Sequence, residues 1–149
     1  MTTIKYIFSI LLFVGLLGVT GCRKKSDDPG PTALDLRLEE LMNDGTNWVL
    51  GSDGVTKDGL DVTDQFAGFK LTIGNKTYST VNGLSPVWEP TGTWDFQSDN
   101  PDLIVRDGST QVTVNLSTSA LTLIFTAAGV PGGRVKSVSG EYQFHLVSE

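Results

Sequence analysis

The chain of 149 residues contains one cysteine, one histidine and two methionines. A single cysteine permits no internal disulfide bond, so the fold must be held together by its apolar core. A single histidine, His145, leaves little material for histidine-dependent catalysis. Long apolar runs are also missing. The run at residues 6–19 is shorter than the roughly 20 residues that a membrane-spanning helix needs.

Positive charge is scarce in most of the chain. Residues 34–149 hold seven Lys or Arg against fifteen Asp or Glu, a net charge of −8. A domain this acidic is a poor candidate for contacts with a phosphate backbone, which need clustered cations. We therefore expect no nucleic-acid partner.

The residues that could carry catalysis are few and scattered. His145 lies on an expected strand, opposite in phase to Phe144 and Leu146, and no GxSxG nucleophile motif accompanies it. Residues 52–64 and 98–102 are rich in Asp, but neither stretch has the spacing of a calcium loop, and Asp and Asn are ordinary turn formers. We expect no enzyme, no catalytic residue, no metal site and no cofactor.

The N-terminus has a specific pattern. Lys5 precedes the apolar run, which ends in small residues before Cys22, the layout of a secretory signal peptide. The tetrapeptide "VTGC" at residues 19–22 resembles the lipobox of bacterial lipoproteins. The resemblance implies that residues 1–21 are a cleaved signal peptide and that the Cys22 thiol carries acyl chains. An uncleaved anchor helix with an incidental cysteine is the alternative.

The lipobox also implies a partner and a location. Two or three acyl chains on Cys22 would give lasting attachment to membrane lipid, whereas one chain binds only marginally. Residues 22–32 would then be the lipidated cysteine and a tether rich in Pro and Gly. Arg23 follows the cysteine where an Asp would favour the inner membrane, so we expect the outer membrane. The periplasmic and the cell-surface side both stay open.

Residues 33–149 are expected to form one all-β domain with a short N-terminal helix at residues 33–43. Thr32 is positioned to cap this helix, and Gly45 is expected to close it. After it, the apolar pattern changes to period two, which is typical of strands with one buried face. Eight strands are expected, at residues 46–50, 68–74, 76–81, 91–96, 102–106, 110–116, 120–127 and 140–147. They predict an antiparallel meander, closed as a barrel or folded as a two-sheet sandwich, with longer connections at residues 51–65, 82–90 and 127–137.

A helix, a tryptophan on the first strand and about eight meandering strands together resemble the lipocalin-like domains of Bacteroidetes lipoproteins. The stretches "GLDVTDQFAGFKLTI", "VWEPTGTWDF" and "GEYQF" carry this resemblance. Two departures are evident: the first strand reads "GTNW" where lipocalins have Gly-x-Trp, and a disulfide is absent. The resemblance implies a lipocalin-like barrel but names no ligand.

Three tryptophans are the remaining candidates for binding. Trp48 and Trp94 lie on expected strands, where core packing is the default. Trp88 lies between two prolines on an expected loop, where an exposed indole could stack on a sugar or a protein. The alternative is that Trp88 folds back as a lid on the barrel end. We expect a small apolar ligand in the barrel or a structural role, with recognition of a glycan or protein around Trp88 as the alternative function.

Overall fold

The computed structural model describes residues 29–129 and 138–149. A helix, α1 (Ala33–Met42), is followed by a short 3-10 turn, η1 (Asn43–Gly45). A second 3-10 turn, η2 (Thr63–Phe66), lies between the second and third strands. The strands are β1 (Trp48–Lys57), β2 (Leu60–Asp61), β3 (Lys70–Gly74), β4 (Thr77–Val81), β5 (Thr91–Gln97), β6 (Asn100–Arg106), β7 (Thr110–Leu116), β8 (Ala120–Ala127) and β9 (Gly140–Ser148).

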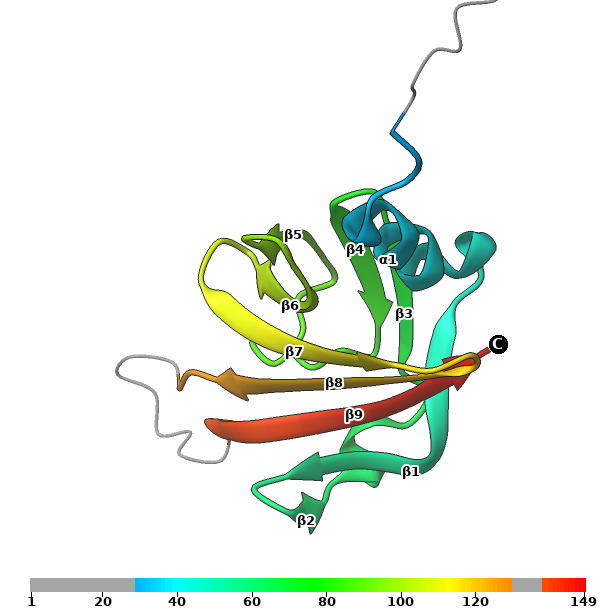
Figure 1. The fold of residues 1–149 in the computed structure, drawn as a ribbon. Coiled ribbons are helices and arrows are strands. Elements are labelled where there is room, and N and C mark those ends of the chain that lie inside the picture. The colour runs from blue at the N-terminus through cyan, green and yellow to red at the C-terminus, as the bar shows by residue number, and fades with distance from the viewer. Residues whose placement is uncertain (1–28, 130–137) are drawn as a thin grey trace, which may run out of the picture.

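The strands form a closed antiparallel barrel (Figure 1). From β3 to β9 each strand pairs with the next along the chain, and β1 pairs with both β3 and β9. Eight strands therefore close the barrel, while β2 only forms a hairpin with the distal half of β1. The predicted all-β fold with one short helix is confirmed. Of the two arrangements expected, the barrel is the one formed.

The period-two pattern of the sequence sets the two faces of the barrel wall. On β8, Leu121, Leu123 and Phe125 are buried, and the two residues between them are half-buried. On β9, Phe144 and Leu146 are buried in the same way. Successive side chains of a strand point to opposite faces, so these residues fill the barrel interior.

Helix α1 begins where the sequence predicts. The Thr32 hydroxyl accepts a hydrogen bond from the Asp35 amide, and the Asp35 carboxylate accepts one from the Thr32 amide, which forms a complete capping box. The end of the helix differs from the prediction. Asn43, in the left-handed conformation at φ 49°, caps the helix in place of Gly45. Gly45 ends the 3-10 turn η1, which redirects the chain into β1.

The connection expected at residues 51–65 is largely regular structure, so this prediction was wrong. Strand β1 continues to Lys57 through an irregularity between Leu50 and Val55, and it stays paired with β9 on both sides of that irregularity. The "GSDG" sequence is typical of a turn, but a bulge lets the strand bend while its pairing continues. The Asp-rich stretch at residues 98–102 is likewise only partly a turn, because β6 begins at Asn100.

The two ends of the barrel are closed by different elements. Helix α1 lies over one end, and the β1–β2 hairpin lies at the other (Figure 1). Leu41 of α1 is buried, and its carbonyl accepts a hydrogen bond from the Trp48 indole at 2.9 Å. At the opposite end, Phe66 of η2 and Trp88 of the connection at residues 82–90 enter the core. Both ends are therefore filled from within the domain.

Candidate functional site

A small cavity lies in the barrel interior, between core side chains. The cavity has a volume of about 20 Å³, above the roughly 10–15 Å³ that one water molecule needs. Arg106 is the one charged side chain in its wall. The other lining residues are apolar or aromatic: Leu41, Leu71, Ile73, Tyr78, Trp88, Trp94, Ile104 and Leu123.

Arg106 is the last residue of β6 and lies opposite Trp94 of β5. It is 5% exposed, which is unusual for an arginine. Its guanidinium lies over the rings of Trp88 and Phe125, with 4.1 and 4.5 Å between the guanidinium carbon and the two ring centroids. Its Nη2 group donates a hydrogen bond to the Val87 carbonyl at 3.0 Å. Arg106 thus holds the 82–90 connection against the barrel wall.

Asp107 provides a partial counter-charge at the rim. Its Oδ2 atom lies 3.6 Å from Nε of Arg106 and accepts a hydrogen bond from the Tyr78 hydroxyl at 2.7 Å. Its Oδ1 atom accepts a hydrogen bond from the Thr93 amide at 3.0 Å. Asp107 therefore forms an ion pair with Arg106 at 3.6 Å and also accepts hydrogen bonds from Tyr78 and Thr93.

Burial shifts the proton affinity of this cluster. The pKa of Arg106 is lowered by desolvation, although a guanidinium stays charged in proteins at any ordinary pH. The pKa of Tyr78 is raised, first by burial and then by its hydrogen bond to Asp107. At neutral pH Arg106 is therefore a cation and Tyr78 keeps its phenol proton.

Three buried N–H groups of this cluster lack a hydrogen-bond partner among the described residues. They are Nε and Nη1 of Arg106 and Nε1 of Trp88. An unpaired buried donor costs about 1–3 kcal/mol, and more when the group is charged. All three belong to two side chains that contact each other and line the same cavity. Arg106 and Trp88 therefore keep buried N–H groups without a hydrogen-bond acceptor among the described residues, while the surface of the cavity itself is apolar.

The structure separates the three tryptophans singled out in the sequence. Trp48 is 2% exposed, and Trp94 is 4% exposed with its indole N–H donating to the carbonyls of Gly74 and Thr77. Trp88 is 3% exposed and folds back into the barrel end, as the lid interpretation has it. Trp88 and Trp94 line the internal cavity, whereas Trp48 borders a surface groove. A ligand-binding role for the three residues stays a prediction.

Trp88 packs into an aromatic cluster. Its ring centroid lies 5.3 Å from that of Phe125 and 5.4 Å from that of Tyr78, both in edge-on geometry. The rings of Phe69 and Phe144 lie 6.0 and 5.9 Å away. Such contacts add about 0.5–1.5 kcal/mol each beyond the burial of area. Trp88 is thus the centre of the core at this end of the barrel.

The side chains that could hold a metal ion do not come together in the described residues. His145 lies on β9, half-buried, with its Nδ1 atom 3.3 Å from the hydroxyl of Thr122 on β8. In the described part of the chain, no three His, Cys, Asp or Glu side chains lie close enough together to hold a metal ion.

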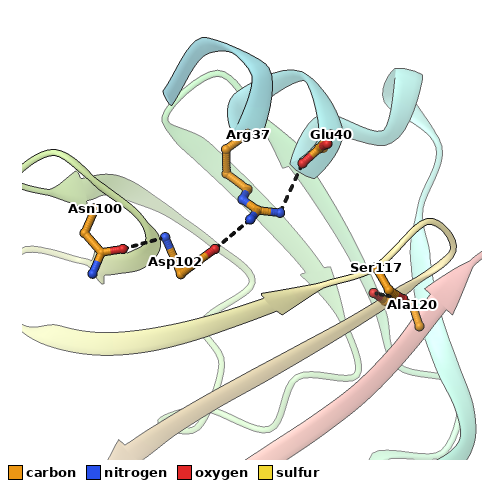
Figure 2. A network of polar contacts seen from close by, with 6 residues as sticks. All are labelled: Arg37, Glu40, Asn100, Asp102, Ser117 and Ala120. Carbon is orange, nitrogen blue, oxygen red and sulfur yellow. Dashed lines mark hydrogen bonds and ion pairs between the residues drawn. The ribbon is translucent and has the colours of Figure 1, made fainter. Parts of the chain in front are cut away.

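A surface groove lies outside the barrel, between α1 and the connection from β7 to β8. Its larger part has a volume of about 580 Å³ and is bordered by acidic residues of α1 and by Ser117. Arg37 lines the groove and forms ion pairs with Glu40 of its own helix and with Asp102 of β6, at 3.0 and 2.6 Å (Figure 2). Because the Asp102 carboxylate is exposed, its ion pair with Arg37 ties the helix to the barrel only weakly.

Sequence reasoning missed Arg106, the residue around which the internal cluster is built. The alternation of the strand could have revealed it, because Arg106 lies on the same face of the strand as Ile104. The sequence does not show which face points inward, because Leu103 and Val105 make the other face equally apolar. Cys22, the predicted lipidation site, lies outside the described residues.

Comparisons with models of protein families, with curated proteins and with solved structures find no match to this chain. In the described residues, no helix has the length and apolar character needed to cross a bilayer. The barrel and its buried arginine cluster are therefore the observations on which a functional proposal can rest.

Proposed function

We propose that this chain is a lipid-anchored envelope protein whose lipocalin-like barrel has a structural, non-enzymatic role. Packing is the observation that carries the proposal. Pockets for small molecules measure about 300–1,000 Å³, whereas the cavity inside this barrel measures about 20 Å³. An eight-stranded barrel is narrow enough for its own side chains to fill it.

Storage of a small apolar ligand in the barrel is the alternative within this proposal. Such a ligand would have to displace Trp88 and its four aromatic neighbours, which occupy the end of the barrel away from α1. Recognition of a glycan or protein through rim loops around Trp88 would require an exposed indole. At 3% exposure, Trp88 supports the structural role better than either alternative.

The anchor in this proposal is Cys22, with residues 1–21 removed and membrane lipid as the partner. The spacing of the "VTGC" pattern behind the apolar run supports it. The proposed location is the outer membrane, from the absence of Asp after the cysteine. A filled barrel is compatible with either side of that membrane.

Mass spectrometry of the protein purified from bacterial membranes tests both parts of the proposal. The denatured protein is expected to begin at an acylated Cys22, and a C22S variant is expected to lack the acyl mass. A free Cys22 thiol or an intact Met1 would contradict the anchor. Under native conditions the protein is expected to carry no non-covalent organic molecule, and a stoichiometric apolar ligand would contradict the structural role.

A further inference from the structure

We propose that the connection at residues 82–90 is a lid, which opens as one body and carries Trp88 out of the barrel end while the strands stay folded. The connection links the end of β4 to the start of β5 and belongs to no strand. In the structure it is closed, with Trp88 buried. In the open form the Trp88 indole reaches solvent, so recognition through this side chain is restricted to that form. The structural role proposed above does not depend on the lid.

The connection is folded compactly on itself. The Trp88 amide donates a hydrogen bond to the Gly83 carbonyl, and the Val87 amide donates one to the Leu84 carbonyl. Gly83 lies so close to Trp88 that a Cβ atom on Gly83 would be 2.6 Å from the Cβ atom of Trp88. These contacts lie within the connection and are kept when it moves away from the barrel, so we expect it to move as a unit.

The connection is held to the barrel at its start, its middle and its end. At its start, the side-chain amide of Asn82 donates hydrogen bonds to two carbonyls just before β3, at 3.0 and 3.3 Å. In its middle, Arg106 donates to the Val87 carbonyl. At its end, the amide and the hydroxyl of Thr80 donate to the carbonyls of residues 90 and 89. Opening therefore requires the loss of the Asn82 and Arg106 bonds, whereas Thr80 lies beside the hinge at residue 90 and keeps its bonds.

Two residues at the start of the connection have a left-handed backbone, with φ 56° at Asn82 and φ 52° at Leu84. Asparagine tolerates this conformation, whereas it is an outlier for a bulky side chain such as that of leucine. The Leu84 side chain is also 48% exposed, so it gains little from apolar burial in the closed form. Leu84 therefore stores backbone strain that opening releases, and such strain is typical of ligand clamps and switch regions.

The closed form also leaves polar groups unpaired. Nε1 of Trp88 and Nη1 of Arg106 are buried and have no hydrogen-bond partner among the described residues. Water pairs with both groups once the connection has moved away. The packing of Trp88 against four aromatic rings opposes this gain and keeps the lid closed in most molecules. Because these effects are confined to one end of the barrel, we expect opening to cost less free energy than global unfolding.

Thiol labelling at two buried positions of the full chain tests the lid. V87C places a thiol in the connection, and V112C places one in the barrel wall on β7, at positions that are 2% and 0% exposed. Both are made in the C22S background, where the introduced thiol is the only one in the chain. With dithionitrobenzoate in the absence of denaturant, we expect V87C to react at least about tenfold faster than V112C, because it needs only local opening. Low concentrations of urea should change the rate of V87C little and raise that of V112C steeply, since global unfolding exposes far more surface.

Further substitutions in the V87C protein test the cause of opening. L84N places a residue that tolerates left-handed backbone at the strained position and should slow labelling about fivefold. R106M removes the bond to the Val87 carbonyl and should speed labelling, whereas the control R37M, outside the barrel, should leave the rate unchanged. Labelling of V87C only at the rate of its own global unfolding, with the urea dependence of V112C, would overturn the proposal. An unchanged rate in L84N would also overturn it, even if R106M fails to fold.

Discussion

Arg106 and Trp88 determine, at the scale of single residues, how one end of the barrel is closed. The guanidinium of Arg106 stacks on the Trp88 ring and donates a hydrogen bond to the Val87 carbonyl. A side chain on β6 therefore holds the connection at residues 82–90 in place. Cation–π contacts that are shielded from water are worth about 2 kcal/mol or more. The cluster thus offsets part of the cost of burying a guanidinium.

Replacing Trp88 by Ala tests its place at the centre of the core. Loss of the indole leaves a cavity among four aromatic rings, and we expect W88A to lower the free energy of unfolding by about 3–5 kcal/mol in urea titrations. The space would have the shape of the lost indole and would be bounded by those rings and by the guanidinium of Arg106. Indole should therefore raise the Tm of W88A and leave that of the wild-type protein unchanged. A loss below about 1 kcal/mol would indicate that Trp88 is not packed as described.

The raised pKa of Tyr78 leads us to expect that the folded protein loses stability at alkaline pH. Burial raises its pKa, so the folded protein keeps the phenol proton to a higher pH than the unfolded chain, in which the pKa is about 10. This stabilisation is fully present below about pH 10 and is lost as the pH rises further, because only the unfolded chain then releases the proton. The Tm of the wild-type protein should fall steeply above about pH 10.

The Y78F variant is the matched control for this pH dependence, because it removes the ionising group and keeps the ring. Its Tm should fall less steeply with rising pH than that of the wild-type protein. Some loss should remain, since burial also raises the pKa of Tyr142. Identical slopes for the two proteins would show that Tyr78 does not contribute.

At the scale of elements, helix α1 and strands β7 to β9 could be predicted from the sequence because their local signals agree with the fold. Thr32 and Asp35 form the capping box that their spacing allows, and the alternating residues of β8 and β9 face the core as their phase predicts. Residues 51–65 could not be predicted in the same way. Their Gly and Asp residues favour turns, but pairing with β9 continues on both sides of a bulge.

The capping box gives a prediction for this helix. T32A removes the hydroxyl that accepts the Asp35 amide, and we expect it to lower the free energy of unfolding by about 1 kcal/mol. The control is T118A, at the exposed connection between β7 and β8, which should change stability by less than about 0.5 kcal/mol. Chemical denaturation measures both. Equal stability of T32A and T118A would show that α1 does not depend on its cap.

At the scale of the whole molecule, closure of the sheet follows from the number and spacing of the strands, and the barrel was one of the two arrangements expected. The contents of the barrel could not be predicted. Trp88 packs inward against Arg106, which lies on β6, and the residues of β6 just before Arg106 are apolar on both faces, so they do not mark it as a core residue. An alternating pattern marks the wall of a barrel but does not show what closes its ends.

The filled interior is the central claim, and titration with a fluorescent fatty-acid analogue tests it most directly. A barrel with a cavity of about 20 Å³ has no room for the probe. We expect neither a saturable rise in probe fluorescence nor a change in tryptophan emission at any probe concentration below its aggregation limit. Saturable one-to-one binding that an unlabelled fatty acid displaces would contradict the filled barrel and favour ligand storage.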